Sequence, residues 1–409
     1  MDATPSTSDE VAWLAGPEGQ AAIAEAATLP DTESPAAVQR IRRTYGAYAA
    51  AALTQAELRR RAGVKFGAGA AQWLWTRAGL EQATRPAVAA HRAGVLAAAG
   101  ARRVLDLGCG LGTDAAAFAT AGLHVVAVEL DERTAAVARA NLAGLPVEVR
   151  QGDARALADE LWEPGTAVFA DPARRTGAGR TWDPADFSPP LDWALGLLDR
   201  AAADGGVGCL KLGPGLPYRL IPDHVGAEWT SHDGDLVEVA LWQGPDGTEA
   251  LPVPGSRTAI LLTTDGAVDR LRARDVSVGL RAPEVGAMLW EPGSAVVRAG
   301  AVDTLAALLG AGRVAEDIAY LIGDDPGPGA AGPYATAFVI REVLPAKEKV
   351  LRAWVREHQV GRLEIKKRGI DTDPAALRRR LRPAGTHAAT LVLTPTSAGA
   401  RALVVDRVA

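Results

Sequence analysis

The chain contains 409 residues, with 48% hydrophobic and 23% charged side chains and a formal net charge of -5. This composition predicts a soluble globular protein with room for two to four domains, and it excludes a protein that is basic throughout. Two cysteines, Cys109 and Cys209, are too few for a disulfide framework or a zinc site. No apolar run reaches the roughly 20 residues of a membrane span, and the polar start MDATPSTSDE does not resemble a signal sequence, so we expect a cytoplasmic protein.

The first half of the chain divides into two expected domains. Residues 1–98 are rich in alanine with helical spacing, as in RRTYGAYAAAALTQAELRRRAG, which predicts packed helices. From Arg102 short apolar strands alternate with helices, from RRVLDLG to GVGCLKLG. This alternation predicts a parallel sheet covered on both faces, over residues 99–245.

The second half predicts two smaller α+β units. Residues 246–333 form the first, which ends in the Gly/Pro-rich stretch GDDPGPGAAGP, a linker or long loop. Residues 334–409 form the second, with a helix at DPAALRRRLRP and four strands, at ATAFVIREV, GRLEIKKRG, HAATLVLTPT and RALVVDRV.

A glycine-rich turn, DLGCGLG, follows the first strand of the expected sheet. It lacks the Gly-Lys-Ser/Thr ending of a triphosphate-binding loop. A dinucleotide site is harder to exclude, but its third glycine would stand where Thr113 is. Asp106, at the end of the strand, would repel a pyrophosphate and suits a cationic ligand. The glycines let the backbone approach that ligand closely, and a helix is expected to begin at Thr113 or Asp114.

Two further carboxylates end the next two strands. Glu129 closes VVAVEL, where it can accept both hydroxyls of a ribose, and Asp153 closes VRQGD, where it can accept an adenine amino group. The alternative is that the carboxylates at these strand ends merely cap the helices that follow.

These residues resemble the class I S-adenosylmethionine-dependent methyltransferases over Arg102 to Trp242. The resemblance implies S-adenosylmethionine as cofactor, with the methionine part near the glycines, the ribose near Glu129 and the adenine near Asp153. Cys109 lies in this loop, where a small apolar side chain explains it better than a catalytic thiol. The expected cofactor-binding residues are Asp106, Gly108, Cys109, Gly110, Gly112, Asp114, Glu129, Leu130, Asp153, Ala154 and Asp171.

The fourth strand ends in Asp171-Pro172-Ala173-Arg174, which resembles the Asp/Asn-Pro-Pro-aromatic motif of amino methyltransferases. In that reading Asp171 and the Pro172 carbonyl are catalytic, because together they accept both N–H groups of an amine and direct its lone pair. Ala173 and Arg174 depart from the motif. Arg174 and Arg175 could stack on a base or hold a phosphate, and Trp182 could supply the missing aromatic ring. Alternatively, Asp171 caps a turn and both arginines are solvated.

Lys211, near the end of the strand GVGCLKLG, could bind a substrate phosphate or pair with Asp171 or another carboxylate. The six histidines show no metal-ligand spacing, and we expect no metal.

The flanking segments narrow the resemblance. KFGAGAAQWLWTRAGLEQATRPAVAAHRA resembles the helical extension of a bacterial methyltransferase group that has a C-terminal THUMP-like domain, and LEIKKRGIDTDPAALRRRLRPAGTHAATLVLTP resembles that domain. The likeness is weakest between Gln243 and Pro333, where the group would have a ferredoxin-like unit. A looser likeness to cap guanine N2 methyltransferases would bring four residues near the cofactor, although plain packing is an equal alternative. They are Lys65, Phe66, Gln82 and Thr84.

Residues 362–382 contain eight basic and three acidic side chains, a local net charge of +5 in a protein of net -5. Such a concentration is typical of contact with an RNA backbone, although a solvated helix is also a common cause. THUMP domains deliver structured RNA to modifying enzymes, which favours RNA. The expected substrate-binding residues are Arg174, Arg175, Lys211, Lys366, Lys367 and Arg368.

The fold class expected is therefore α/β, a Rossmann-like class I methyltransferase sheet with an N-terminal helical extension and C-terminal ferredoxin-like and THUMP-like units. The function expected is methylation of a nucleobase nitrogen in structured RNA such as tRNA or rRNA. The alternatives are a methyltransferase for DNA or a small molecule, and a catalytically silent cofactor-binding RNA scaffold. The sequence does not indicate an oligomeric state.

Overall fold

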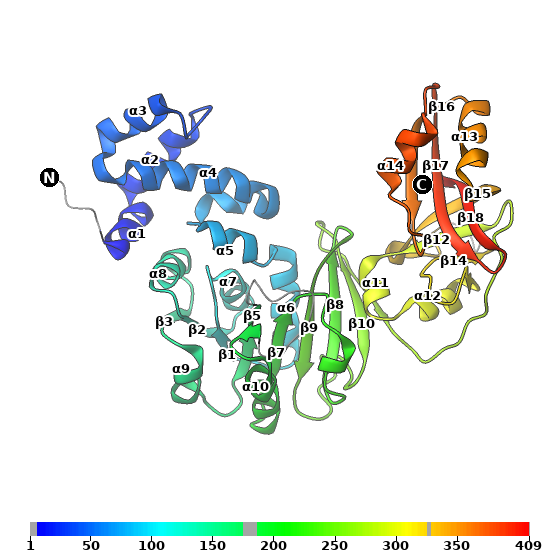
Figure 1. Cartoon of the computed structure of the whole chain (residues 1–409). Helices are drawn as coiled ribbons and strands as arrows, with labels where there is room; N and C mark the ends of the chain where they lie inside the picture. Colours follow the sequence, from blue (N-terminus) through cyan, green and yellow to red (C-terminus); the bar gives the residue numbers. More distant parts are fainter. Residues whose placement is uncertain (1–5, 175–185, 325–328, 409) are drawn as a thin grey trace. The chain divides into compact units, whose positions relative to one another are not determined.

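The computed structural model describes residues 6–174, 186–324 and 329–408 (Figure 1). They divide into two compact units. The first comprises Met1–Gly226 and Val239–Gly255, and the second comprises Ala227–Glu238 and Ser256–Ala409. Arg175 and Trp182 lie outside the described residues. No described helix is long and apolar enough to cross a membrane.

Six helices open the first unit, as the alanine-rich sequence predicts. They are α1 (Thr7–Ala15), α2 (Pro17–Ala27), α3 (Pro35–Tyr45), α4 (Ala49–Phe66), α5 (Arg77–Gln82) and α6 (Pro86–Ala98). Serine side chains cap two of them: Ser6 accepts the Asp9 N–H and Ser34 accepts the Ala37 N–H. Within the segment RRTYGAYAAAALTQAELRRRAG, α3 ends at Gly46, whose φ is 56°, and α4 follows.

A mostly parallel sheet forms the rest of the first unit, in the order β9-β7-β4-β1-β2-β3. Its first five strands along the chain run parallel, and β9 pairs antiparallel with β7. The strands are β1 (Arg103–Leu107), β2 (His124–Glu129), β3 (Val147–Gln151), β4 (Ala167–Ala170), β7 (Gly208–Leu212) and β9 (Asp235–Gln243). Since β1 has β2 on one side and β4 on the other, the chain order reverses between β1 and β4, where open α/β sheets bind ligands.

Four helices connect these strands and pack on the sheet. They are α7 (Thr113–Thr120), α8 (Glu132–Asn141), α9 (Ala154–Leu161) and α10 (Leu191–Ala203). Phe118 of α7 and Phe169 of β4 are both buried and meet edge to face, with ring centroids 5.3 Å apart. Between β4 and α10 the described chain forms a small hairpin of β5 (Ala173–Arg174) and β6 (Phe187–Ser188).

The second unit contains strands of two sheets. In one, β10 (Arg257–Leu262) pairs parallel with β8 (Gly226–His232) and antiparallel with β11 (Val268–Arg272). The other has seven strands in the order β13-β14-β12-β15-β18-β17-β16. They are β12 (Met288–Pro292), β13 (Gly312–Arg313), β14 (Leu321–Gly323), β15 (Ala335–Pro345), β16 (Val360–Lys367), β17 (His387–Thr396) and β18 (Gly399–Arg407).

Four helices belong to this unit: α11 (Ser294–Arg298), α12 (Val302–Leu309), α13 (Glu348–Glu357) and α14 (Pro374–Leu381). Leu351 and Trp354 of α13 pack with Leu377 and Leu381 of α14 in one apolar core with β16, β17 and β18. The helix α13 was not among the predicted elements, although its buried residues Leu351, Trp354 and Val355 have the i, i+3, i+4 spacing of an amphipathic helix.

The structure confirms the α/β fold class with a Rossmann-like sheet. The sequence predicted one ferredoxin-like unit over residues 246–333. In the structure these residues contribute β10 and β11 to the sheet that contains β8, and β12, β13 and β14 to the seven-stranded sheet. The proposed domain boundaries at residues 98, 245 and 333 stay predictions.

Candidate active site

The glycine-rich turn after β1 is held against β2 by its own backbone. The N–H groups of Gly108 and Cys109 both donate to the Val128 carbonyl, at 2.9 and 3.0 Å. Gly108, Gly110 and Gly112 have φ values of 99°, 56° and 90°, in the left-handed region that favours glycine. A Cβ on Gly112 would also lie 2.7 Å from the Leu142 side chain. The loop therefore needs glycine for its conformation, and it begins α7 at Thr113, as the sequence predicts.

Asp106 lies fully buried at the end of β1, and among the residues that the structure describes neither of its carboxylate oxygens has a hydrogen-bond partner. Burial raises the pKa of this carboxyl well above its ordinary value, and the nearby Asp114 and Asp171 raise it further. The positive charges of Arg92 and Lys211 lower this pKa, but by less. A buried acceptor pair without a donor is costly unless a ligand satisfies it. The ammonium group of S-adenosylmethionine fits this position, because it brings both a positive charge and N–H donors.

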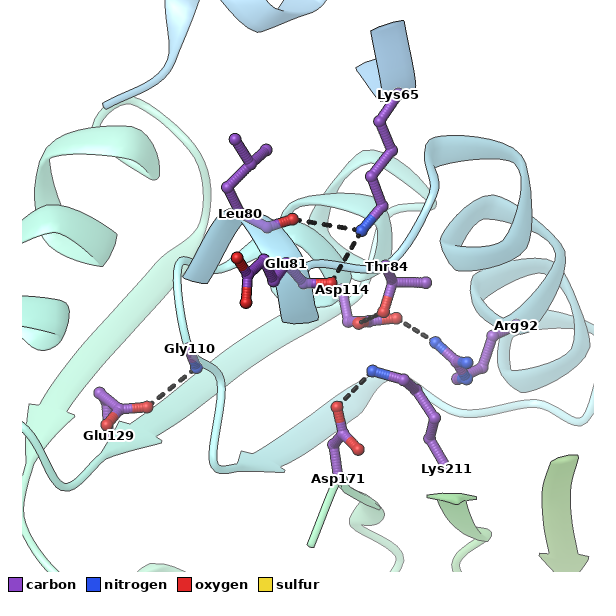
Figure 2. Close-up of polar contacts among 10 residues, drawn as sticks. All are labelled: Lys65, Leu80, Glu81, Thr84, Arg92, Gly110, Asp114, Glu129, Asp171 and Lys211. Atoms are coloured by element: carbon purple, nitrogen blue, oxygen red, sulfur yellow. Dashed lines mark hydrogen bonds and ion pairs between the residues drawn. The ribbon is translucent and has the colours of Figure 1, made fainter. Parts of the chain in front are cut away.

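A buried ion pair between α6 and α7 stands beside Asp106. The Arg92 guanidinium, which is 1% exposed, pairs with Asp114, and Thr84 donates a 2.6 Å hydrogen bond to the other Asp114 oxygen (Figure 2). Arg92 also lies over the Phe169 ring, 4.7 Å from its centroid. Thr84 is thus part of this region, as the looser family likeness implies. Arg92 was not among the predicted site residues, although a single arginine among the apolar residues of PAVAAHRAGVLAA was a signal for it.

The three strand-end carboxylates have different partners. Glu129 accepts the N–H groups of Gly110 and Asp131, at 3.0 and 2.9 Å, so its side chain joins the glycine loop to the end of β2 (Figure 2). Leu130 beside it is 65% exposed, an apolar surface on which a base could stack. Asp153 accepts the Arg155 N–H at 2.8 Å and caps α9, as the capping alternative describes, and Ala154 behind it is buried. Its carboxylate remains 45% exposed and accessible to a ligand.

Asp171 directly follows β4, in the neighbourhood of Asp106, and forms an ion pair with Lys211 of β7 (Figure 2). The pairing of Lys211 with Asp171, one of the two roles open from sequence, is therefore present. The Asp171 side chain is 32% exposed and that of Lys211 is 15% exposed, so a ligand can reach the carboxylate. Pro172 is buried and begins the turn toward β5, which contains Ala173 and Arg174.

The helical extension brings Lys65 to the same place. Its Nζ donates to the carbonyls of Leu80 and Glu81, both at 3.3 Å, near the end of α5 (Figure 2). Phe66 packs instead against Trp75, with ring centroids 4.6 Å apart, which fits the packing alternative. Gln82 is the last residue of α5 and is exposed.

Cys109 and Cys209 are buried free thiols. Burial raises the pKa of the Cys109 thiol well above its usual range, and Asp106 and Glu129 add to this effect. A thiol in this state is a poor nucleophile, which supports the structural role expected for it.

The basic segment of the second unit has both paired and exposed side chains. Lys366 forms a 2.8 Å ion pair with Glu291, and Arg368 lies over the Tyr320 ring. Lys367 is exposed on β16. Arg368 also lines a cavity of about 680 Å³, with Trp290, Glu291 and Arg407 among the other lining residues.

Comparisons with known proteins indicate the class to which this chain belongs. An uncharacterized S-adenosylmethionine-dependent methyltransferase of Mycobacterium tuberculosis, present in two strains, is 34% identical over 351 residues, which is 84% of this chain and 91% of that protein. A crystal structure assigned to the methyltransferases, from Porphyromonas gingivalis W83, aligns with a TM-score of 0.74 at 23% identity, over 96% of this chain and 99% of the other.

Three family models match separate parts of the sequence. A family described as "Methyltransferase domain" matches residues 104–169, one described as "THUMP domain-like" matches 335–407, and a "Domain of unknown function" matches 7–62. The fold and site thus define a class I methyltransferase, an enzyme whose cofactor is S-adenosylmethionine. The chain belongs to the S-adenosylmethionine-dependent methyltransferases, with a THUMP-like domain near its C-terminus.

Proposed function

We propose that this enzyme methylates an exocyclic amine of a nucleobase in structured RNA. The observation that carries the proposal is the position of Asp171, directly after β4 and near the buried Asp106, with Lys211 paired to it. A carboxylate at this point can accept an amine N–H, and the adjacent lysine suits a substrate that carries phosphates.

The proposed chemistry requires alignment more than activation by a strong base. The lone pair of an exocyclic amine is delocalised into the base, so the amine is a poor nucleophile until its N–H groups are held. Asp171 and the Pro172 carbonyl would accept those two N–H groups and direct the lone pair, a positioning effect worth at least about 100-fold in rate. S-adenosylmethionine, when bound, supplies the methyl group, and we propose that Asp106, the glycine loop, Glu129, Leu130 and Asp153 hold it.

RNA is proposed as the substrate because of the second unit. The THUMP-like match covers β15 to β18, and most of the basic side chains between residues 362 and 382 are exposed on its surface. Lys367 and Arg368 of this segment would contact the phosphate backbone, and Lys366 would do so to the extent that its pairing with Glu291 allows. A second candidate function is a catalytically silent RNA-binding scaffold. The ion pair between Asp171 and Lys211 favours it, because the pair occupies the carboxylate that methyl transfer to an amine would need.

The test is transfer of label from methyl-labelled S-adenosylmethionine to separated tRNA, rRNA, DNA and small-molecule fractions from cells that lack the protein. We expect label in one RNA fraction, at least about 100-fold less with Asp171→Ala and an intermediate amount with Asp171→Asn, which keeps one carbonyl acceptor. Asp192→Ala, an exposed position in the first turn of α10, serves as the matched control.

Cofactor binding measured by calorimetry separates loss of chemistry from loss of folding. Label in DNA or in the small-molecule fraction would overturn RNA as the substrate. Bound cofactor with no label in any fraction would establish the scaffold.

A further inference from the structure

The second unit contains the cavity of about 680 Å³, and all of its described lining residues belong to that unit. Most of them come from the end of β12, the start of β15, the end of β18 and the turn that precedes β15. Backbone hydrogen bonds hold this turn in place. The Gly332 N–H donates to the Gly329 carbonyl at 2.8 Å. The Gly293 N–H, just after β12, donates to the Tyr334 carbonyl, also at 2.8 Å, so the turn is tied to the neighbouring wall of the cavity.

One side of the cavity is apolar. It is formed where β12 and β15 pair, with Met288 opposite Val339 and Trp290 opposite Ala337. Met288 and Trp290 are buried and form the floor, while Val339 and Ala337 are half-buried. Because the side chain of Ala337 is small, it leaves space above the sheet. A flat apolar group of a ligand could lie there and bury its surface.

Two arginines give the cavity a positive charge. Arg368 and Arg407 both line it, and in the part of the chain that the structure describes neither forms an ion pair with a carboxylate. Glu291, the one acid among the described lining residues, accepts from Lys366 at 2.8 Å and from the Tyr320 hydroxyl at 3.4 Å. Its charge is thus already balanced, and the two guanidinium groups remain for an anion. A guanidinium can hold a phosphate through two N–H groups at once.

A ligand that suits this cavity is anionic at one end and apolar at the other. The volume lies within the range of cavities that bind small molecules. Inorganic phosphate alone would leave the apolar side uncovered. A base-paired nucleotide would have to bring its partner strand into the cavity. An unpaired nucleotide meets both requirements, with its phosphate and with its base, and unpaired bases are the parts of RNA that proteins usually bind in pockets.

We propose that this cavity binds one unpaired nucleotide, with the phosphate at Arg368 and Arg407 and the base over Ala337 and Val339. The expected source is a single-stranded part of the RNA substrate; a free nucleotide has the same chemistry, and the experiment separates the two. The inference rests on the proposed function for this source. It adds a second contact to that function, because the methylated amine is expected at Asp171 in the first unit.

The site can be tested by binding, without turnover. A short, fluorescently labelled single-stranded RNA and the same RNA annealed to its complement are each titrated with the full-length protein, and ribonucleoside monophosphates are added as competitors. We expect the single strand to bind more tightly than the duplex. Arg368→Met and Arg407→Met should each lower the affinity for the single strand at least about tenfold and reduce its salt slope by about 1. Arg401→Met, which removes the same charge near the start of β18 and outside the lining residues, should keep the affinity.

Two variants that fill the cavity distinguish it from a merely basic surface. Ala337→Leu and Ala330→Leu add apolar volume among the lining residues without a change of charge. Each should weaken binding of the single strand about 5- to 100-fold, because the base loses its place, while the salt slope and the binding of the duplex stay unchanged. Ala330 is exposed in the turn before β15, so this variant leaves the strands intact even if Ala337→Leu does not fold.

The outcomes separate this inference from the function on which it rests. Equal binding of single strand and duplex, or no effect of a folded cavity-filling variant, would overturn the nucleotide site. Monophosphates that compete as well as the single strand would support the site but overturn RNA as its source. If RNA is methylated in an Asp171-dependent way while the cavity-filling variants bind normally, the site is wrong and the function stands. If those variants lose the single strand but no RNA is methylated, the site stands and the function is wrong.

Discussion

Replacing Arg92 by methionine tests the most deeply buried charge pair of the cofactor region. The substitution keeps an apolar stem but leaves Asp114, whose side chain is 9% exposed, without its cation. Breaking a buried pair in this way costs about 3–5 kcal/mol of unfolding free energy. At roughly 2–4 °C per kcal/mol for a unit of this size, the melting temperature should fall by roughly 6–20 °C.

Arg200 provides the matched control for Arg92→Met. It also pairs with an aspartate, Asp159, and lies over an aromatic ring, Trp162 at 4.0 Å, but its side chain is 37% exposed. Arg200→Met should cost less than about 1 kcal/mol, because solvent screens an exposed pair.

Urea unfolding followed by tryptophan fluorescence measures both variants. The double variant Arg92→Met/Asp114→Asn should recover part of the loss, because no buried charge is then left unpaired. Equal costs for Arg92→Met and Arg200→Met would refute the argument that burial of the pair makes it important.

Three further predictions concern ligands. Burial raises the pKa of Asp106, Asp114 and Asp171 add to the rise, and Arg92 and Lys211 oppose it. Affinity for S-adenosylmethionine should therefore weaken as pH falls through that raised pKa, because the protonated carboxyl no longer attracts a cation. The free protein should lose stability as pH rises from the ordinary pKa of an aspartate to that raised pKa, since the unfolded carboxyl ionises first. Calorimetry and thermal melts over a pH series check both trends, and a pH-independent affinity would contradict them. Glu129→Ala should lower cofactor affinity about 10- to 100-fold by calorimetry, since the Gly110 and Asp131 N–H groups lose their acceptor, whereas the exposed Glu132→Ala should not. Lys367→Ala should weaken RNA binding and reduce its salt slope by about 1; an unchanged slope would remove this residue from the interface.

The cofactor loop could be predicted from sequence because its signals are local. Gly108, Gly110 and Gly112 are required by backbone angles within one turn, and β1 is an apolar run that stops at that turn. The strands after residue 334 were predicted nearly at their observed limits for the same reason, since alternation and turn residues lie within each segment.

The side-chain pairings could not be settled from sequence, where the pairing of Lys211 with Asp171 was one of two open roles and that of Arg92 with Asp114 was not predicted, because they join segments that are distant in sequence. Arg92 meets Asp114 only because α6 packs beside α7, and Lys211 meets Asp171 because β7 lies next to β4. The three strand-end carboxylates look equivalent in sequence, yet Asp106 is buried with no hydrogen-bond partner among the described residues, Glu129 binds backbone N–H groups and Asp153 caps a helix. Their differences come from burial, which a sequence pattern does not report.

Gly79 of α5 lies so close to the glycine loop that a Cβ there would be 2.6 Å from the Leu111 side chain. Leu111 and Val137 of α8 belong to the same apolar core as the helices of residues 7–82, and Asn141 hydrogen-bonds the backbone of Leu74 and of Leu111. The N-terminal helices therefore pack directly against the glycine loop and α8. A different set of N-terminal helices would have to provide the same space for the Leu111 side chain that Gly79 provides. We therefore expect these helices and the parallel sheet to be inherited together, although they match two separate sequence families.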